Sequence, residues 1–452
     1  MKIPSVRLQF KSAFLLLLAA LLAFGIQPTT VRAVTQQTAY EAIQFGAHDT
    51  IVRQISFTAN SITGLAALNL TGLHVVTLNS SFGPYVCSIE GVGDCSGATP
   101  TYWAYYHWNN TGSAWESSAV GAGTYTVTAG ANEGWVYLGF TANPDLQYLP
   151  SAQRVQAVPP AAAWLQTQQA ADTGGYGDPG SSDEALLAAG SDGYRAGAWI
   201  RQTGSPSLWG YWLANGISYA KKGADSAGKL AAGLQAARAC WQAAALHPTA
   251  SYSATTGLYT GANGSGDGPQ TWAILGSLAL GDSVPAKAVT ALTSTVQADG
   301  GWEWQSGFGS DTNTTALVVQ ALLATGVPTD TAVITDAMAY LASAQQDDGG
   351  IAYSAPFTST VSDADSTAYA VMAIQAAGGD PTSAGWTKNG KTPISYLLSL
   401  QLANGSFEWQ KGNGANFLAT TQAIPALLGN DYLLSGNTLT QCSISYLPFV
   451  KR

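Results

Sequence analysis

The chain has few residues of the kinds that build transition-metal centres. Of its 452 residues, only 4 are His, 4 are Cys and 3 are Met. A zinc site needs three or four converging nitrogen, sulfur or oxygen ligands. Four turn carboxylates lack the spacing of a calcium-binding loop, and we interpret them as ordinary turn residues: Asp299, Glu303, Asp347 and Asp348. The sequence therefore predicts no metal site.

Charge is also scarce. The chain has 18 Lys plus Arg against 27 Asp plus Glu, for a net charge of −9, and no cluster of basic residues. Nucleic acids and anionic lipids need a positive surface. We therefore expect no nucleic-acid partner, and a small-molecule ligand or a surface partner instead.

Long apolar runs are absent after the start of the chain. Basic residues precede one uncharged apolar run, Ala13–Ile26, and small residues follow at Val31–Ala33. This arrangement is typical of a signal peptide, which we place at residues 1–33. The run is too short to span a bilayer. We expect no transmembrane segment and a secreted or cell-surface protein.

The four cysteines are Cys87, Cys95, Cys240 and Cys442. In an oxidising compartment an even number favours two disulfides. We favour Cys87–Cys95 as a local loop staple, with Cys240–Cys442 as the second pair. The alternative is that Cys240 is a free, buried helix residue.

The chain divides into two parts of different pattern. From Ile51 to about Phe140 the chain alternates apolar with polar or aromatic residues in segments such as "HVVTLN" and "GWVYLGF", with one short helix in "SITGLAALNLTGL". We assign residues 34–140 to this part. They predict a small, mainly antiparallel β domain. Residues 141–162 hold four prolines without periodicity and predict a linker. Residues 163–430 are helical and repetitive, and residues 431–452 form a C-terminal tail.

Four segments of the helical part share one pattern: a helix that ends in an aromatic-Leu pair, then Gln, then a Gly-rich turn with an apolar or aromatic residue. They are Trp164–Tyr176, Thr293–Trp302, Tyr340–Ile351 and Tyr396–Phe407. The second segment lacks the aromatic-Leu pair, and its spacer is one residue shorter. A second helix follows in segments Asp267–Gly281, Asp311–Gly326, Asp363–Gly378 and Asn416–Gly429. A repeat of roughly 50 residues is one helical hairpin, and stacked hairpins form a solenoid or a ring.

This pattern, with the "DGGW" turn, resembles the repeats of the terpenoid cyclase and protein prenyltransferase α/α-toroid superfamily. The resemblance implies a closed ring of helical hairpins over residues 163–430. The superfamily hosts several activities, so fold alone does not assign one. Zinc-dependent protein prenylation needs an Asp-x-Cys motif, and complement-like toroids need Cys-Gly-Glu-Gln; neither motif is present.

The first part also has a likeness. "CSIEGVGDC", "YWAYYHW" and "GAGTYTVTAGANEGWVY" look like the small β domain at the C-terminus of transcobalamin and intrinsic factor, here placed before the toroid. The resemblance implies a corrinoid-like ligand by analogy, although no corrinoid-contacting residue matches position by position. No other cofactor is expected.

One motif carries the hypothesis of an enzyme. Class II terpenoid cyclases protonate an alkene or epoxide with the middle Asp of Asp-x-Asp-Asp-Thr-Ala, and "DADSTA" matches except that Ser366 replaces the last Asp. The resemblance implies that Asp365 is the acid and Asp363 its partner. Such an acid must be neutral, and aromatic walls must stabilise the cation.

Internal alignment separates the two carboxylates. Asp363 aligns with Asp311, Asp267 and Asn416, residue types preferred at a helix N-cap. Asp365 aligns with Asn313, Pro269 and Leu418, so the repeat does not require a carboxylate there. We interpret Asp363 as an N-cap and Asp365 most simply as a solvated residue of the first helical turn.

Aromatic residues are the remaining candidates for a ligand site. The residues proposed to line it are Trp199, Trp209, Tyr211, Trp212, Trp302 and Trp304. The alternative is that they pack in the core.

We therefore predict a two-domain protein, a β domain followed by an all-α toroid. The favoured function is non-catalytic binding of a small molecule or a surface partner. One alternative is a class II terpenoid-cyclase-like enzyme that uses Asp365, and another is a structural surface or adhesion module.

Overall fold

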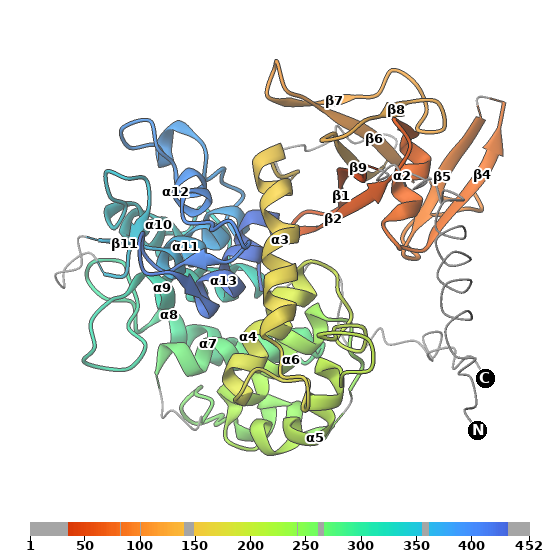
Figure 1. Ribbon diagram of the computed structural model, residues 1–452. Coiled ribbons are helices and arrows are strands. Elements are labelled where there is room, and N and C mark those ends of the chain that lie inside the picture. Colours follow the sequence, from red (N-terminus) through yellow and green to blue (C-terminus); the bar gives the residue numbers. More distant parts are fainter. Residues whose placement is uncertain are drawn as a thin grey trace, which may run out of the picture. The chain divides into compact units, whose positions relative to one another are not determined.

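The computed structural model describes residues 35–81, 83–99, 101–139, 149–241, 243–260, 266–354 and 361–432. A β domain comes first, with a five-stranded sheet in the order β2-β1-β9-β6-β7 (Figure 1). Only the β1–β9 pair is parallel in this sheet. The predicted mainly antiparallel β domain is confirmed. The sheet strands are β1 (Gln37–Gly46), β2 (Asp49–Phe57), β6 (Thr101–Asn109), β7 (Ala114–Ser117) and β9 (Asn132–Gly139).

Strand β1 was not predicted, since the extended pattern was placed from residue 51 onward. Its polar residue Glu41 is fully buried, because β1 lies between β2 and β9. Glu41 lies directly opposite Glu133 of β9, which is also buried. Trp135 Nε1 donates to Glu41 at 3.0 Å, and the Tyr105 hydroxyl donates to Glu133. Glu41, the polar residue that hides the apolar pattern of β1, therefore belongs to a buried, hydrogen-bonded acid pair with Glu133.

Smaller elements complete the domain. The predicted short helix is α2 (Gly64–Leu70), and the disulfide Cys87–Cys95 is present as predicted. Two further pairs are formed by β3 (Ile62–Thr63) with β8 (Thr126–Val127) and β4 (Val75–Ser80) with β5 (Gly83–Ile89). The predicted pair Cys240–Cys442 involves Cys442, which lies outside the described residues.

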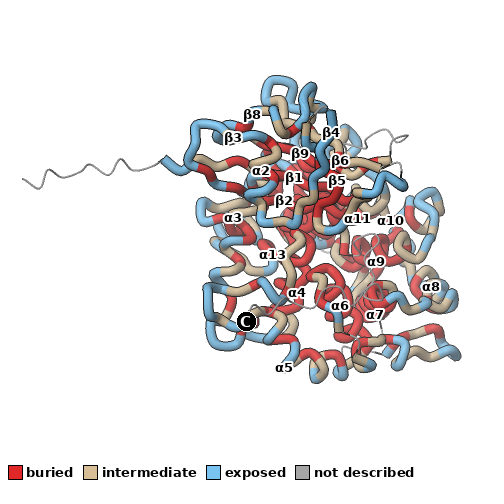
Figure 2. The backbone as a smooth tube through the Cα atoms, turned by 90° about the vertical axis from the view of Figure 1, so that its right-hand side faces the viewer, coloured by how far each residue is buried: buried red, intermediate tan, exposed pale blue. Residues whose placement is uncertain are grey.

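Among the described residues, six helices form a closed inner ring, because each contacts the next and α13 contacts α4. They are α4 (Pro179–Ser191), α6 (Ala224–Ala236), α7 (Asp267–Ala279), α9 (Thr312–Ala324), α11 (Ala364–Ala376) and α13 (Phe417–Leu428). Outer helices cover them: α3 (Ala152–Gln168), α5 (Leu208–Ala220), α8 (Ala286–Thr293), α10 (Ala332–Ser343) and α12 (Pro393–Ser399). Between α6 and α7 the outer position holds two 3₁₀ turns, Ala244–Leu246 and Pro248–Ser251. The predicted ring is confirmed, and its inner helices are mostly buried (Figure 2).

The repeated Gln has a structural role that we call the glutamine lock. In three repeats its side-chain N–H groups donate to a carbonyl of its own Gly turn and to a carbonyl of a neighbouring segment. The locks are Gln169 to Gly174 and Trp199, Gln345 to Gly349 and Trp386, and Gln401 to Gly405 and Ala157. The last lock joins the final repeat to α3, so it contributes to ring closure.

A hydroxyl column connects each turn to its inner helix. Thr367 Oγ1 donates to the Asp363 carbonyl at 2.6 Å and accepts the Ile351 N–H at 2.9 Å. Thr420 makes the same two contacts, and Thr315 accepts the N–H of Trp302. Buried backbone groups therefore find partners at each repeat, as a packed ring requires.

The predicted linker at residues 141–162 is wrong over its second half. Helix α3 begins at Ala152 and includes Pro159 and Pro160. Proline inside a helix usually costs about 3 kcal/mol. Tertiary contacts offset this cost, since Val155 and Val158 are fully buried, and Arg154 donates to carbonyls at the end of α13 at 2.7 and 3.2 Å.

The β domain shares one hydrophobic core with the ring, through residues such as Val52 and Val136. Arg53 forms a buried ion pair at 3.2 Å with Asp192, the C-cap of α4. The amide of Asn430, just after α13, exchanges hydrogen bonds with the backbone of Thr50. The β domain thus packs against the carboxyl ends of inner helices. Within the described ranges, no helix is both long and apolar enough to cross a membrane.

Candidate active site

Asp363 is an N-cap, as predicted. A short strand pair, β10 (Ile351–Ala352) with β11 (Ser362–Asp363), brings it to the start of α11. Its two carboxylate oxygens accept the N–H and the hydroxyl of Ser366, each at 2.8 Å. Burial raises the pKa of Asp363, and these hydrogen bonds partly oppose the rise. Both oxygens are therefore occupied in holding the first helical turn.

The predicted cap column holds at two further helices. Asp311 accepts from Thr314 N at 2.7 Å, and Asn416 accepts from Ala419 N at 3.0 Å. Asp267 is the exception, because it is the first residue of α7 and Gly266 is the cap. The Asp267 carboxylate instead accepts from the Thr295 hydroxyl at 2.7 Å, which ties α7 to the end of α8.

Asp365 is partly exposed as a residue, but one of its carboxylate oxygens is not solvated as we expected. Its Oδ1 is buried and has no hydrogen-bond partner among the described residues. Burial raises the pKa of Asp365 to about 7, with further contributions from Asp363 and Glu184. Asn313, the aligned residue of α9, also has a buried Oδ1 without a described partner. The interaction of Asp365 with Glu184 of α4 indicates that this helix position faces the ring interior.

Aromatic side chains lie in the same interior. Tyr369 follows Asp365 by four residues, so the two share one face of α11. The ring of Tyr369 lies 5.7 Å from that of Tyr432, which in turn lies 5.4 Å from the ring of Trp272. All three aromatic residues are buried, and Tyr432 N donates to Gln320 at 3.1 Å. Tyr432, which follows the predicted end of the ring at residue 430, therefore packs among buried residues of the ring.

An ion pair between two neighbouring inner helices lies beside these aromatic residues. Lys229 Nζ of α6 lies 2.5 Å from Glu184 Oε1 of α4 and 5.0 Å from the centre of the Trp272 ring. Burial acts to lower the pKa of Lys229, but Glu184 and neighbouring groups outweigh it and leave the pKa above its usual value. Lys229 therefore keeps its positive charge, and the carboxylate of Glu184 balances it. Neighbouring Asp183 is fully buried, and burial raises its pKa well above the usual range.

Aromatic residues also edge the amino ends of the inner helices. The backbone carbonyls of Trp304, Tyr353 and Trp409 accept the N–H of the first or second residue of α7, α9 and α11, at 3.3, 2.8 and 2.9 Å. Each of these residues therefore closes the inner helix of the preceding repeat. Tyr353 is 48% and Trp409 39% exposed, and Phe308 in the Trp304 loop is 71% exposed. The amino end of the ring thus presents an apolar edge beside Asp365.

Two of the edge loops have nearly the same sequence, "EWQSGFG" at 303–309 and "EWQKGNG" at 408–414. Glu303 accepts the N–H groups of Gly307 and Gly309 at 2.8 and 2.9 Å. Glu408 accepts those of Gly412 and Gly414 at 3.1 and 2.8 Å. Each glutamate therefore folds its own loop.

Most of the aromatic residues predicted to line a ligand site lie elsewhere. Trp199, Trp212 and Trp302 are fully buried in the core, and Tyr211 is also buried. Trp209 is half-buried and packs on Trp241. Trp304 alone of the six belongs to the edge described above. The interior residues Glu184, Lys229, Trp272, Tyr369 and Tyr432 were not predicted as site residues.

Comparison with known proteins agrees with this geometry. Residues 270–421 match the family model of the squalene-hopene cyclase C-terminal domain. This match runs from α7 to α13 and covers the second half of the helical ring. No curated protein matches the chain.

Three solved structures illustrate the likeness of the toroid. Apo type II terpene cyclase MstE from Scytonema is 15% identical with a TM-score of 0.46, over 61% of this chain and 98% of that chain. A variant of MstE in complex with geranylgeranyl dihydroxybenzoate, given as its substrate, is 14% identical with a TM-score of 0.47, over 61% and 97%. Candida albicans protein geranylgeranyltransferase-I with GGPP is 12% identical with a TM-score of 0.37, over 63% and 86%. The toroid fold alone does not assign an activity to this chain.

Proposed function

We propose that the toroid is a class II terpenoid-cyclase-like enzyme in which Asp365 protonates a carbon–carbon double bond of a neutral prenyl substrate. One observation carries this proposal: Asp365 Oδ1 is buried toward the ring interior and has no hydrogen-bond partner among the described residues. A carboxylate placed there for stability alone leaves its buried oxygen unsatisfied, which costs about 1–3 kcal/mol. An acid that donates its proton to a bound substrate needs a carboxyl oxygen that no protein group occupies.

The protonation state of Asp365 suits a general acid. With a pKa of about 7, roughly half of the molecules hold the neutral acid at pH 7. Burial is the main cause, and the nearby carboxylates of Asp363 and Glu184 add to it. The proposed activity therefore falls as the pH rises above about 7.

The proposed step transfers one proton. The O–H bond of Asp365 breaks, a C–H bond forms at one carbon of the alkene, and positive charge develops at the other carbon. The π electrons of a second double bond attack that carbon and close a ring. The final cation loses a proton to solvent, which restores neutrality, and a proton taken up from solvent restores the acid form of Asp365. The faces of Tyr369, Tyr432 and Trp272 supply cation–π stabilisation. Glu184 offsets the charge of Lys229, so the ammonium opposes the cation less.

Asp363 is a positioning residue in this proposal. Its carboxylate is engaged by Ser366, which stands where related cyclases have their last Asp. The cap fixes the first turn of α11 and therefore the direction of Asp365. Asp363 is expected to matter for stability, typically by about 1 kcal/mol.

The test compares Asp365→Asn with Asp363→Ala, using farnesol, geranylgeraniol and squalene as substrates and product analysis by mass spectrometry. Asp365→Asn should abolish turnover while leaving the melting temperature near that of the natural chain. Asp363→Ala removes a cap and should lower the melting temperature while keeping turnover in the folded fraction. Asp311→Ala, which removes a cap in the neighbouring repeat, controls for the loss of a cap alone.

Two results would reject the proposed role of Asp365. If the natural chain binds these polyprenes but does not convert them, or if Asp365→Asn turns over as fast, the acid role is rejected. The sequence-based alternative of non-catalytic binding would then be tested by calorimetry with a corrinoid panel. The leader-like segment at 1–33 supports a further proposal, that the protein works outside the cytoplasm.

A further inference from the structure

One repeat lacks the glutamine lock. In the turn of residues 296–301, Gln297 N donates to Gly301 O at 2.9 Å and its side chain donates to Thr295 O at 2.8 Å. Gln346 makes the same two contacts in the next repeat, at 2.8 Å each. The structural equivalent of Gln297 is therefore Gln346, and Val296 stands where Gln345 is the lock. The shorter spacer in this repeat is thus a replacement of the lock by valine.

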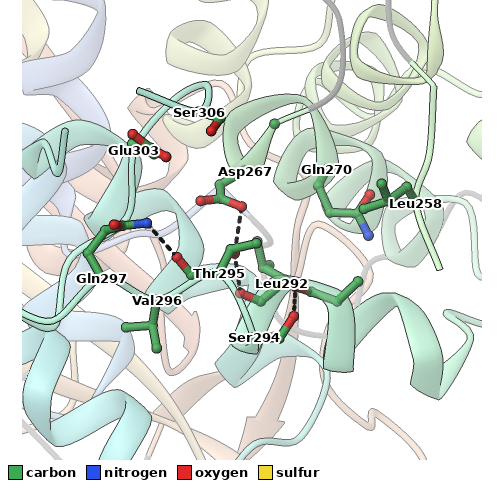
Figure 3. Close-up of a pocket in the computed structure, with 12 residues that line it drawn as sticks. Leu258, Asp267, Gln270, Leu292, Ser294, Thr295, Val296, Gln297, Glu303 and Ser306 are labelled. Carbon is green, nitrogen blue, oxygen red and sulfur yellow. Dashed lines mark hydrogen bonds between the residues drawn. The ribbon is translucent and has the colours of Figure 1, made fainter. Parts of the chain in front are cut away.

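A pocket of about 400 Å³ lies beside Val296. Figure 3 shows its walls, which come from Leu258, the first turn of α7, the end of α8, and the segments at 294–297 and 303–306. This volume is within the range of small-molecule sites. None of its lining residues lies on α4 or α11, which hold Glu184 and Asp365.

The lining combines an apolar wall with hydrogen-bond acceptors. Leu258, Leu292 and Val296 form the apolar part, while Asp267 and Glu303 bring carboxylates. Burial raises the pKa of Asp267 to about 6, and the nearby carboxylate of Glu303 adds to the rise. None of the lining residues described is Lys, Arg or His. The pocket therefore has negative potential and no cation of its own.

We propose that this pocket binds a small organic ammonium, with its N–H groups toward Asp267 and Glu303 and its hydrocarbon part against Leu258, Leu292 and Val296. A primary ammonium is a donor without acceptors, and it suits a site rich in acceptors. Charge-assisted hydrogen bonds are about twice as strong as neutral ones. This proposal is independent of the proposed cyclase activity, because the two sites share no residue.

The first experiment compares two probes that differ only in the polar group. Cyclohexylmethylamine and cyclohexylmethanol are titrated into the natural chain and followed by NMR. The amine should bind at least about tenfold more tightly, which corresponds to about 1.4 kcal/mol. Equal binding of amine and alcohol, or binding of neither, overturns the proposal.

Two variants locate the binding. Val296→Gln restores the residue of the other repeats, and it should abolish amine binding while the melting temperature stays equal or rises. Glu303→Gln should weaken binding about tenfold. Glu408→Gln is its matched control, since Glu408 folds the twin loop and does not line the pocket. Unchanged amine binding by folded Val296→Gln, or equal effects of the two Glu changes, also overturns the proposal.

Discussion

The acid pair of the β domain leads to a strong expectation about pH. Glu41 and Glu133 lie opposite one another on β1 and β9, and both are almost fully buried. Burial raises the pKa of Glu133 to about 7, and the hydrogen bond from Tyr105 opposes the rise. Burial, with the nearby Glu133, raises the pKa of Glu41 well above its usual value. Between pH 4.5 and 7 the folded chain therefore holds more protons than the unfolded chain.

The sign and size follow from this difference. A raised carboxyl pKa stabilises the folded chain fully below pH 4.5, and the contribution is lost as the pH rises through about 7. For Glu133, a pKa of about 7 against 4.5 corresponds to about 3 kcal/mol. With an m-value of about 3 kcal/mol/M, this loss moves the urea midpoint by about 1 M.

The assay is urea unfolding at pH 4.5 and at pH 8, followed by tryptophan fluorescence, for the natural chain and for Glu133→Gln. Glutamine mimics the protonated acid and cannot ionise. The natural chain should lose about 3 kcal/mol more than the variant between the two pH values. Raised carboxyls away from this pair act equally in both chains and cancel. Glu41 stays buried in the variant and loses only the part of its raised pKa that comes from Glu133, which adds to the difference between the chains. If the variant loses as much stability as the natural chain, the reasoning about this pair is refuted.

Three further changes test the ring, each by the free energy of unfolding in urea. Lys229→Met leaves the mostly buried Glu184 without its cation and should cost about 3 kcal/mol, and a second change of Glu184 to Leu should recover much of that loss. Gln401→Val removes the lock that joins the last repeat to α3 and should cost about 1–3 kcal/mol. Gln297→Val, at an exposed position, is its control and should change stability by less than about 0.5 kcal/mol. Thr367→Val removes a hydroxyl that serves two backbone groups and should cost about 1–3 kcal/mol; a neutral result would contradict that role.

The ring is predictable from the sequence because each helical hairpin carries the same short local signals. Gly-rich turns and cap residues recur at one spacing, and each can be recognised from adjacent residues alone. Helix α3 escaped prediction because tertiary burial of Val155 and Val158 overrides two prolines. Strand β1 escaped because Glu41 is buried where a polar residue signals exposure.

The direction of Asp365 could not be predicted for a related reason. An inner helix of the ring contacts neighbours on nearly every side, so its apolar pattern does not tell inward from outward positions. The position of Asp363 was predictable, because capping depends on adjacent residues alone. The ion pair of Lys229 with Glu184 joins two helices distant in sequence, and no local pattern indicates it.

The contacts that complete the fold join the early and the late segments of the described part of the chain. Asn430 bonds Thr50 across 380 positions, and the last glutamine lock joins Gln401 to Ala157 across 244. The segments synthesised first therefore obtain their partners last. Folding rates fall as contacts become more distant in sequence. During synthesis, β1, β2 and α3 must therefore keep apolar surface exposed until α13 has been made.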